Sequence, residues 1–176
     1  YAVAAAKQAG AIISYDPNAR PLLWDSRERA RDVLRSVLPQ VDVIKISDEE
    51  TALLTGASDP DEASRHLIAQ GIGCVVVTLG AKGALVRTAA QPDVSEQVPA
   101  FASKVADTTG AGDSFWGGFL YQLAASGKRP AELTLAEATA FARFGNAVAS
   151  LCVEKRGAIP AMPDLAAVHA RLEGRV

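Results

Sequence analysis

The run Asp107-Thr-Thr-Gly-Ala-Gly-Asp113-Ser-Phe-Trp-Gly-Gly-Phe119 decides how the rest of the chain is interpreted. It places two glycines, Gly110 and Gly112, at the start of a predicted long helix, with the carboxylate of Asp113 in the first turn. The first N–H groups of a helix have no partner inside it, and small residues leave them accessible to an anion. A carboxylate beside them is placed to accept a proton from an attacking hydroxyl. The run therefore favours phosphoryl transfer to an alcohol, which depends on positioning and charge stabilisation.

The composition is that of an ordinary soluble globular protein. The chain has 176 residues, enough for one domain or a large piece of one, and it is 49% hydrophobic and 22% charged. A net charge of -2 gives no electrostatic reason to expect nucleic acid or an anionic membrane as a partner. No apolar run approaches the length of a membrane span. Cys74 and Cys152 lie in apolar runs, which predicts buried, reduced thiols in a cytoplasmic protein.

The chain does not begin with methionine. Its only methionine is Met162, and Tyr1 opens an alanine-rich segment of helical character that ends at Gly10. We therefore expect the chain to be the C-terminal part of a longer protein.

Short apolar runs alternate with helical patterns along the chain. The clearest buried strand is 74–79, because its run is continuous and β-branched. The pattern predicts further strands at 11–15, 41–46, 83–88 and 94–101, the last two antiparallel across a polar loop. It predicts helices at 1–9, 26–38, 47–55, 59–70, 111–126, 134–154 and 163–173. Strands that alternate with helices favour a largely parallel sheet covered on both faces.

Four polar clusters follow predicted strands or close the last long helix. Because ligands of open α/β sheets bind beyond the carboxyl ends of the strands, these clusters could converge on one edge of the sheet. They are Asp16–Arg20, Lys45–Glu50, Thr78–Gly83 and the helix Phe141–Glu154 with the turn Lys155–Ala158. A guanidinium such as that of Arg20 suits phosphate or transition-state charge, although it could instead pair with an acid. Asp16 and Asn18 could equally satisfy the local backbone.

The other clusters also have structural explanations. Ser47-x-x-Glu50 is a capping box, which explains both residues without a ligand. The glycines of Thr78-Leu-Gly-Ala-Lys-Gly83 permit a turn and a close backbone approach, but any strand-turn-strand needs such glycines. Asn146 could be a polar residue of an apolar helix that is hydrogen-bonded internally.

The run that begins at Asp107 resembles the second signature of the ribokinase/PfkB family of carbohydrate kinases, and it matches the whole signature without a gap. The resemblance extends from Gly10 to about Pro163. The stretch from Ser14 to Trp24 is similar to the fructokinases of that family and to the related 2-keto-3-deoxygluconate kinases. The resemblance implies a ribokinase-like three-layer αβα fold of the α/β class, with a mainly parallel central sheet that is incomplete at the N-terminus. Residues 1–176 would be its C-terminal, nucleotide-binding and catalytic part, without the N-terminal sugar-binding and lid part.

The resemblance implies a role for each cluster. Asp113 would be the general base, and Arg20 would add positive charge. The transferred phosphoryl group would be held by the backbone N–H groups of Gly110, Ala111, Gly112 and Asp113. ATP would be lined by Thr78, Gly80, Gly83 and Asn146.

The resemblance also implies two ion sites. Glu50 would orient Mg²⁺ through water, in a motif where Ser47 replaces the Asn of many relatives, as it does in fructokinases. In relatives a monovalent cation such as K⁺ would lie among Asp107, Thr109 and the backbone carbonyls around Cys152 and Gly157.

The expected reaction of the longer protein is transfer of a phosphoryl group from ATP to a sugar, with fructose converted to fructose 6-phosphate. A 2-keto-3-deoxygluconate kinase is the enzymatic alternative, and a non-catalytic truncated homologue that binds nucleotide or protein is the alternative of another class. We expect this chain alone to be inactive, because it could neither orient a sugar nor exclude water. The expected partners are a fructose-like sugar and ATP, with no nucleic acid and no membrane, and a homodimer of the full-length protein is left open.

Overall fold

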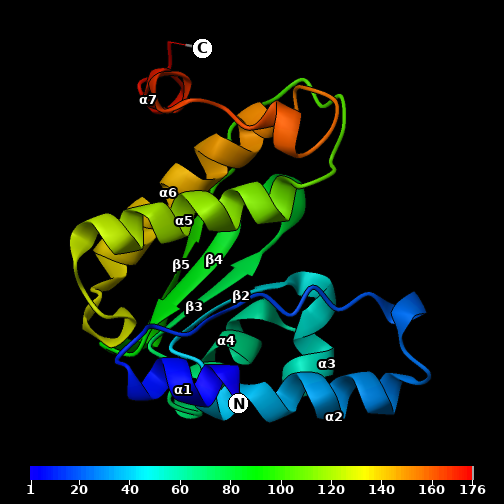
Figure 1. Cartoon of the computed structure of the whole chain (residues 1–176). Coiled ribbons are helices and arrows are strands. Elements are labelled where there is room, and N and C mark those ends of the chain that lie inside the picture. The colour runs from blue at the N-terminus through cyan, green and yellow to red at the C-terminus, as the bar shows by residue number, and fades with distance from the viewer. Residues whose placement is uncertain (176) are drawn as a thin grey trace.

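The computed structural model describes residues 1–175 and places a central sheet between two layers of helices (Figure 1). The sheet has five strands in sequence order: β1 (Ser14–Tyr15), β2 (Val43–Ser47), β3 (Cys74–Thr78), β4 (Ala84–Thr88) and β5 (Gln91–Val98). The pairs β1–β2 and β2–β3 are parallel, and β4 is antiparallel to both of its neighbours. Four of the five strands therefore run in one direction, which confirms the predicted mainly parallel sheet.

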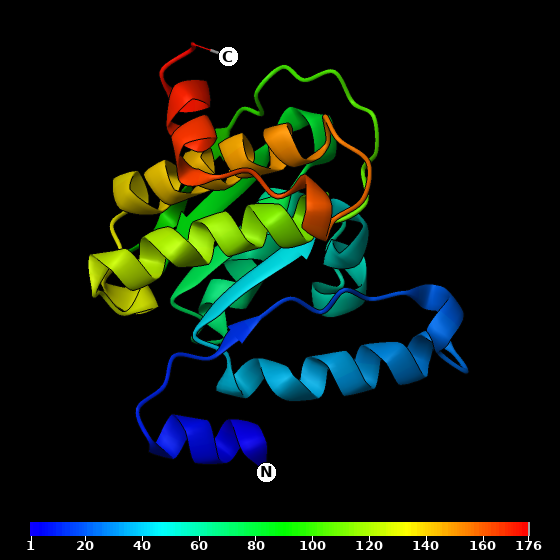
Figure 2. The ribbon, with the colours of Figure 1, turned by 45° about the horizontal axis from the view of Figure 1, so that its top comes forward.

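Helices cover both faces of the sheet (Figures 1 and 2). One face carries α2 (Arg27–Val37), α3 (Thr51–Thr55) and α4 (Pro60–Ala69), and the other carries α5 (Ala111–Ser126) and α6 (Leu135–Cys152). The short α7 (Leu165–Leu172) packs on α6, and α1 (Ala2–Gln8) is fastened by a hydrogen bond from Lys7 Nζ to the Gln40 carbonyl, 2.9 Å. This is the predicted three-layer arrangement. Among residues 1–175, no helix combines the length and the apolarity needed to cross a bilayer.

Alternate residues of the central strands pack into two separate hydrophobic cores, because successive side chains of a strand point to opposite faces of the sheet. In β2, Val43 joins the core under α5 and α6, whereas Ile44 joins the core against α2 to α4. Both side chains are fully buried. In α5, Trp116 and Phe119 stack in the first core with their ring centroids 5.1 Å apart. These two aromatic residues therefore pack in the core.

The helices begin where the sequence offers capping residues. Ser26 accepts a hydrogen bond from the Arg29 N–H at 3.0 Å, and Asp59 accepts one from the Glu62 N–H at 2.9 Å. The segment predicted as one helix over 47–55 is divided into a 3₁₀ turn, Asp48–Glu50, and the short α3.

Two strands differ from the prediction. The strand predicted at 11–15 is only the two-residue β1 at the edge of the sheet, because the Ile13 N–H donates to the Asp42 carboxylate at 2.7 Å instead of continuing a ladder. The strand predicted at 94–101 is β5, which begins three residues earlier. Only two residues, 89 and 90, join it to β4, and its exposed edge position accommodates polar residues and Pro92.

Candidate active site

The start of α5 requires a glycine at Gly110 for two reasons. The φ angle of Gly110 is 79°, in the left-handed region that favours glycine. A Cβ at this position would also lie 2.6 Å from the Cβ of Ala158, so the start of α5 and the turn after α6 lie against each other. Backbone conformation and close packing together explain why the signature has a glycine here.

The first turn of α5 leaves backbone donors free. The Ala111 N–H donates to the Thr108 carbonyl at 3.1 Å and is therefore already paired. Within residues 1–175, the N–H groups of Gly112 and Asp113 have no protein acceptor. The Asp113 side chain is exposed beside them. The Gly110 N–H likewise has no acceptor among these residues, so the helix start has free backbone donors where the sequence predicts an anion.

Asp107 fastens the loop before α5 to the turn after α6. Its Oδ1 accepts from the N–H and the hydroxyl of Thr109, at 2.9 and 2.7 Å, and its Oδ2 accepts from the Gly157 N–H at 2.9 Å. These bonds, the Gly157 N–H first among them, lower the pKa of Asp107 to about 2.

Three of the residues predicted around a monovalent cation, Asp107, Thr109 and Gly157, are thus in direct contact. The carbonyl of the fourth, Cys152, accepts from the Lys155 N–H at 3.2 Å in the same turn. Residues 1–175 hold no cluster of three or more His, Cys, Asp or Glu side chains that could bind a metal. A cation here would therefore have to rely on carbonyl and hydroxyl oxygens around one carboxylate.

Glu50 is a clamp between β2 and the loop after β1. Its Oε2 accepts from the N–H and the hydroxyl of Ser47, at 2.8 and 3.1 Å, which completes the predicted capping box. Its Oε1 accepts from the Ala19 N–H at 2.6 Å. The side chain is buried. The carboxylate thus holds the first two polar clusters together, and its remaining lone pairs are the ones available to water.

The loop after β1 carries one unusual backbone conformation. Asn18 has a φ of 43° and is the only non-glycine residue at positive φ within residues 1–175. Asn tolerates this region, so the turn itself explains Asn18. Arg20 is exposed and takes part in no ion pair within the described chain, so the alternative that it pairs with an acid is not realised.

Of the residues predicted to line the nucleotide, one lies in an open turn and the other three have structural contacts within the protein. At Gly80, φ is 57° and no atom of residues 1–175 lies within 4 Å of where a Cβ would be, so this turn is open. At Gly83 a Cβ would lie 2.0 Å from the Val98 carbonyl oxygen, which explains that glycine by packing. Asn146 is buried, and its Nδ2 donates to the carbonyls of Val98 and Pro99 at 3.1 Å each. Thr78 Oγ1 donates to the Ile46 carbonyl at 3.3 Å.

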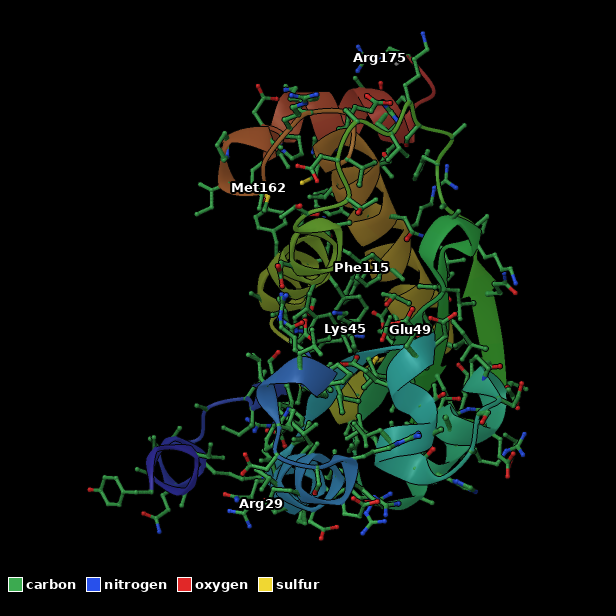
Figure 3. All side chains as sticks on the ribbon, turned by 90° about the vertical axis from the view of Figure 1, so that its right-hand side faces the viewer. Arg29, Lys45, Glu49, Phe115, Met162 and Arg175 are labelled. Atoms are coloured by element: carbon green, nitrogen blue, oxygen red, sulfur yellow. The ribbon has the colours of Figure 1, made fainter. Side chains whose placement is uncertain are left out.

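Sequence reasoning assigned no role to Lys45. Its Nζ donates to Asp16 Oδ2 at 2.8 Å and lies 3.1 Å from where a Cβ of Gly112 would be. Figure 3 shows Lys45 in the middle of the molecule, below Phe115 of α5 and beside Glu49 in that view. The signal in the sequence was a lone charged residue in the apolar run 43–46.

A cleft of about 500 Å³ opens between the loop after β1 and the turn that begins α3. Its lining includes Asn18, Trp24, Lys45, Ser47 and Glu50, but none of residues 107–113. The cleft therefore lies beside the start of α5 rather than at Asp113. Lys45 belongs to both places.

Residues 2–165 match the sequence profile of the pfkB family carbohydrate kinases. The chain belongs to this family. The match includes the run from Asp107 to Phe119 and confirms the resemblance on which the expected roles rest.

Curated relatives of this pfkB chain include two proteins of Arabidopsis thaliana. It is 42% identical over 164 residues to probable fructokinase-5 and 44% identical over 174 residues to probable fructokinase-6, chloroplastic. The alignments cover 92% and 97% of this chain but 49% and 44% of the relatives. The chain thus spans about half the length of the curated relatives it matches.

Solved structures of the family have the same fold. The fructokinase of Vibrio cholerae O395, with fructose, ADP and calcium ion bound, superposes with a TM-score of 0.86 at 36% identity, over 97% of this chain and 54% of that one. The fructokinase of Xylella fastidiosa with bound ATP gives a TM-score of 0.87 at 32% identity, over 99% and 55%. These likenesses confirm the predicted ribokinase-like architecture.

Proposed function

We propose that the protein carrying this chain transfers a phosphoryl group from ATP to a hydroxyl of fructose. The observation that carries the proposal is an exposed carboxylate, Asp113, beside the free N–H groups of Gly112 and Asp113 at the start of α5. Membership of the pfkB family supports phosphoryl transfer to a carbohydrate. The names of the curated relatives, and the fructose and ADP in the Vibrio cholerae fructokinase, support fructose and ATP as the substrates.

In this mechanism Asp113 accepts the proton of the sugar hydroxyl. The hydroxyl oxygen forms a bond to the γ-phosphorus of ATP, and the bond from that phosphorus to the bridging oxygen breaks, so ADP leaves with the electron pair. A positioned general base typically contributes about 10²–10⁴-fold to such a rate. The free N–H groups of Gly110, Gly112 and Asp113 stabilise the charge on the transferred oxygens, and Ala111 belongs to the turn that positions them. The unpaired guanidinium of Arg20 adds positive charge from the loop after β1.

The remaining site residues are proposed to hold the nucleotide and its ions. Mg²⁺ keeps most of its water and binds through one or two carboxylates and the phosphates, so Glu50 suffices as a protein partner through water. When bound, the ion neutralises charge on the phosphates. ATP would be lined by Thr78, Gly80, Gly83 and Asn146. A monovalent cation would be held by Asp107, Thr109 and the carbonyls of Cys152 and Gly157.

We also propose that this chain is the nucleotide-binding and catalytic part of a longer kinase domain, in keeping with its coverage of about half of each relative. A cytoplasmic location is proposed from Cys74 and Cys152, which are both buried free thiols. One relative is named chloroplastic, so the compartment is to be tested by localising the full-length protein.

The test is Asp113→Asn in the full-length protein. We expect kcat with fructose and ATP to fall by about 10²–10⁴-fold, because the amide cannot accept the proton. The affinity for ATP, measured by calorimetry, should stay within about twofold. Asp93→Asn is the matched control, since Asp93 is an exposed carboxylate of β5 that should leave kcat unchanged.

Near-normal turnover of the Asp113→Asn protein would end the general-base assignment. Offering 2-keto-3-deoxygluconate beside fructose tests the acceptor separately. A preference for the acid would overturn fructose while leaving phosphoryl transfer in place. A wild-type protein that phosphorylates neither compound would overturn the proposed function itself.

A further inference from the structure

Lys45 is a buried cation with unused hydrogen-bonding capacity. An ammonium group has three donors, and within residues 1–175 the Nζ of Lys45 uses one of them, on Asp16 Oδ2 at 2.8 Å. The Lys45 side chain is only 9% exposed. Two donors of a buried charge are therefore left without a protein acceptor, which is costly unless a ligand or water accepts them.

Asp16 shows the same incompleteness. Its Oδ2 holds Lys45, but its Oδ1 is buried and has no hydrogen-bond partner in the described chain. Both members of the ion pair, which lies at the end of β1, thus have hydrogen-bonding capacity that the protein does not use. Groups of this kind are expected where a ligand completes the network.

The position of the ammonium indicates which ligand. Its Nζ lies beside Gly112, close to the free N–H groups of Gly112 and Asp113 at the positive end of the α5 dipole. A lysine at a helix N-terminus is unfavourable by itself, because two positive potentials meet. An anion at that point is attracted by both the ammonium and the helix N-terminus. Lys45 also lines the neighbouring cleft, so a ligand can reach it from outside.

We propose that Lys45 is a further catalytic residue, whose ammonium donates a hydrogen bond to the phosphoryl group during its transfer, with Asp16 as the residue that positions it. The inference rests on the proposed phosphoryl transfer and extends its charge-stabilising site from the start of α5 to β2. The conformation of the loop after β1 then also matters for catalysis, because that loop carries Asp16. Glu50 holds the loop in place by accepting a hydrogen bond from the Ala19 N–H.

The first experiment compares Lys45→Met with Lys45→Arg in the full-length protein. We expect Lys45→Met to lower kcat by about 10²–10³-fold, the scale of losing one donor to a developing anion. The KM for fructose and the Kd for MgADP should stay within about threefold. Lys45→Arg keeps the charge and should recover at least about tenfold of the loss. Lys128→Met is the matched control, because Lys128 is also ion-paired, to Glu137, but on the loop beyond the far end of α5.

A second measurement separates charge stabilisation from a merely structural role. MgADP with aluminium fluoride imitates the phosphoryl group in transit, so the ratio of the Kd values for MgADP without and with fluoride reports the charge site alone. We expect this ratio to collapse toward one in Lys45→Met and to fall partly in Asp16→Asn. It should be unchanged in Lys128→Met.

The outcomes that overturn the inference are distinct from those that overturn the kinase. An active wild-type protein whose Lys45→Met variant keeps kcat within about threefold, or keeps the fluoride effect, would overturn Lys45 alone. Loss of MgADP binding in proportion to kcat would overturn it too, since that result indicates damage to the fold. If Lys45→Met does not fold, Asp16→Asn decides, and full kcat in that variant overturns the inference. An inactive wild-type protein removes the proposed function and this inference with it.

Discussion

Two buried cations on the strands that flank β3, Arg87 of β4 and Lys45 of β2, differ in how many protein acceptors they have. Arg87 is fully buried, and each of its three nitrogens has a partner: Nε donates to Ser64 Oγ at 2.9 Å, Nη1 to the Pro92 carbonyl, and Nη2 to Asp61. Arg87 thereby fastens α4 to β4 and β5. Asp61 has a lowered pKa, caused first by the hydroxyl of Ser95 and then by nearby Arg87 and Arg65.

Within residues 1–175, the Nζ of Lys45 has one acceptor, Asp16, and it lies beside the free backbone N–H groups of α5. The difference between the two residues teaches how to distinguish a structural charge from a functional one. Arg87 is held by three protein acceptors and stabilises the fold at that place, whereas Lys45 has a single acceptor and lies next to backbone N–H groups that have none, which indicates a missing ligand. Three predictions test or sharpen this distinction.

The largest effect on stability is expected for Asp61→Ala. It leaves the fully buried Arg87 guanidinium without its partly exposed carboxylate, and leaving a buried charged donor unpaired costs about 2–3 kcal/mol of unfolding free energy. Guanidinium denaturation of the variant and the wild type measures the loss. Turnover of the folded variant should be unchanged, because none of the Arg87 partners belongs to the candidate site.

Glu62→Ala is the control for Asp61→Ala. Glu62 is the next residue of α4 and is exposed, and among the described residues its one ionic neighbour is His66, at 3.9 Å. Its removal should change stability by less than about 0.5 kcal/mol. If both variants had similar stability, the interpretation of Arg87 as a charge that stabilises the fold would be wrong.

The two ends of α5 provide a second comparison. Gly110 and Gly127 both adopt left-handed backbone, but only Gly110 is crowded, by Ala158. Gly127→Ala should cost roughly 1–2 kcal/mol for the conformation alone and leave kcat intact. Gly110→Ala should cost more stability, because the Cβ overlap is added. It should also lower kcat by about 10²-fold, the scale of a 1 Å misplacement of catalytic groups.

Stability curves and turnover of the two variants in the full-length protein check this prediction. Equal losses of kcat in both variants would show that α5 as a whole, rather than its first turn, sets the activity. The functional end of the helix would then not be distinct from its structural end.

The sequence predicted the layers, the order of the elements and the signature helix, because each rests on local patterns. Continuous apolar runs indicated β2 and β3, and capping residues such as Ser26 and Asp59 marked helix starts within a residue. The errors lie at the edges of the sheet. β1 is shortened by the long-range contact between Ile13 and Asp42, and β5 is an exposed strand with no apolar run to mark its beginning.

The candidate site could be predicted only as far as single segments allow. Residues of the run from Asp107 were identified because the motif is contiguous. The contacts between segments could not be, and these include Glu50 with Ala19, Asn146 with the end of β5, and Lys45 with Asp16 and Gly112. Each joins residues at least 29 positions apart, so only the folded sheet brings them together.

The smallest effect on stability is expected for Asp107, a carboxylate of the candidate site that can be compared with Asp61 of the Arg87 cluster. Both carboxyls have a lowered pKa, but that of Asp107, about 2, is caused chiefly by the Gly157 N–H and by Thr109 rather than by a buried cation. A depressed pKa in the folded state means that the stabilisation is fully present above the ordinary value near 3.8 and is lost as the pH falls toward 2. The difference in melting temperature between wild type and Asp107→Asn should therefore be constant from pH 7 to about pH 5 and shrink below about pH 4. A difference that persists unchanged to pH 2.5 would mean that the shape of Asp107, and not its charge, joins the start of α5 to the turn after α6.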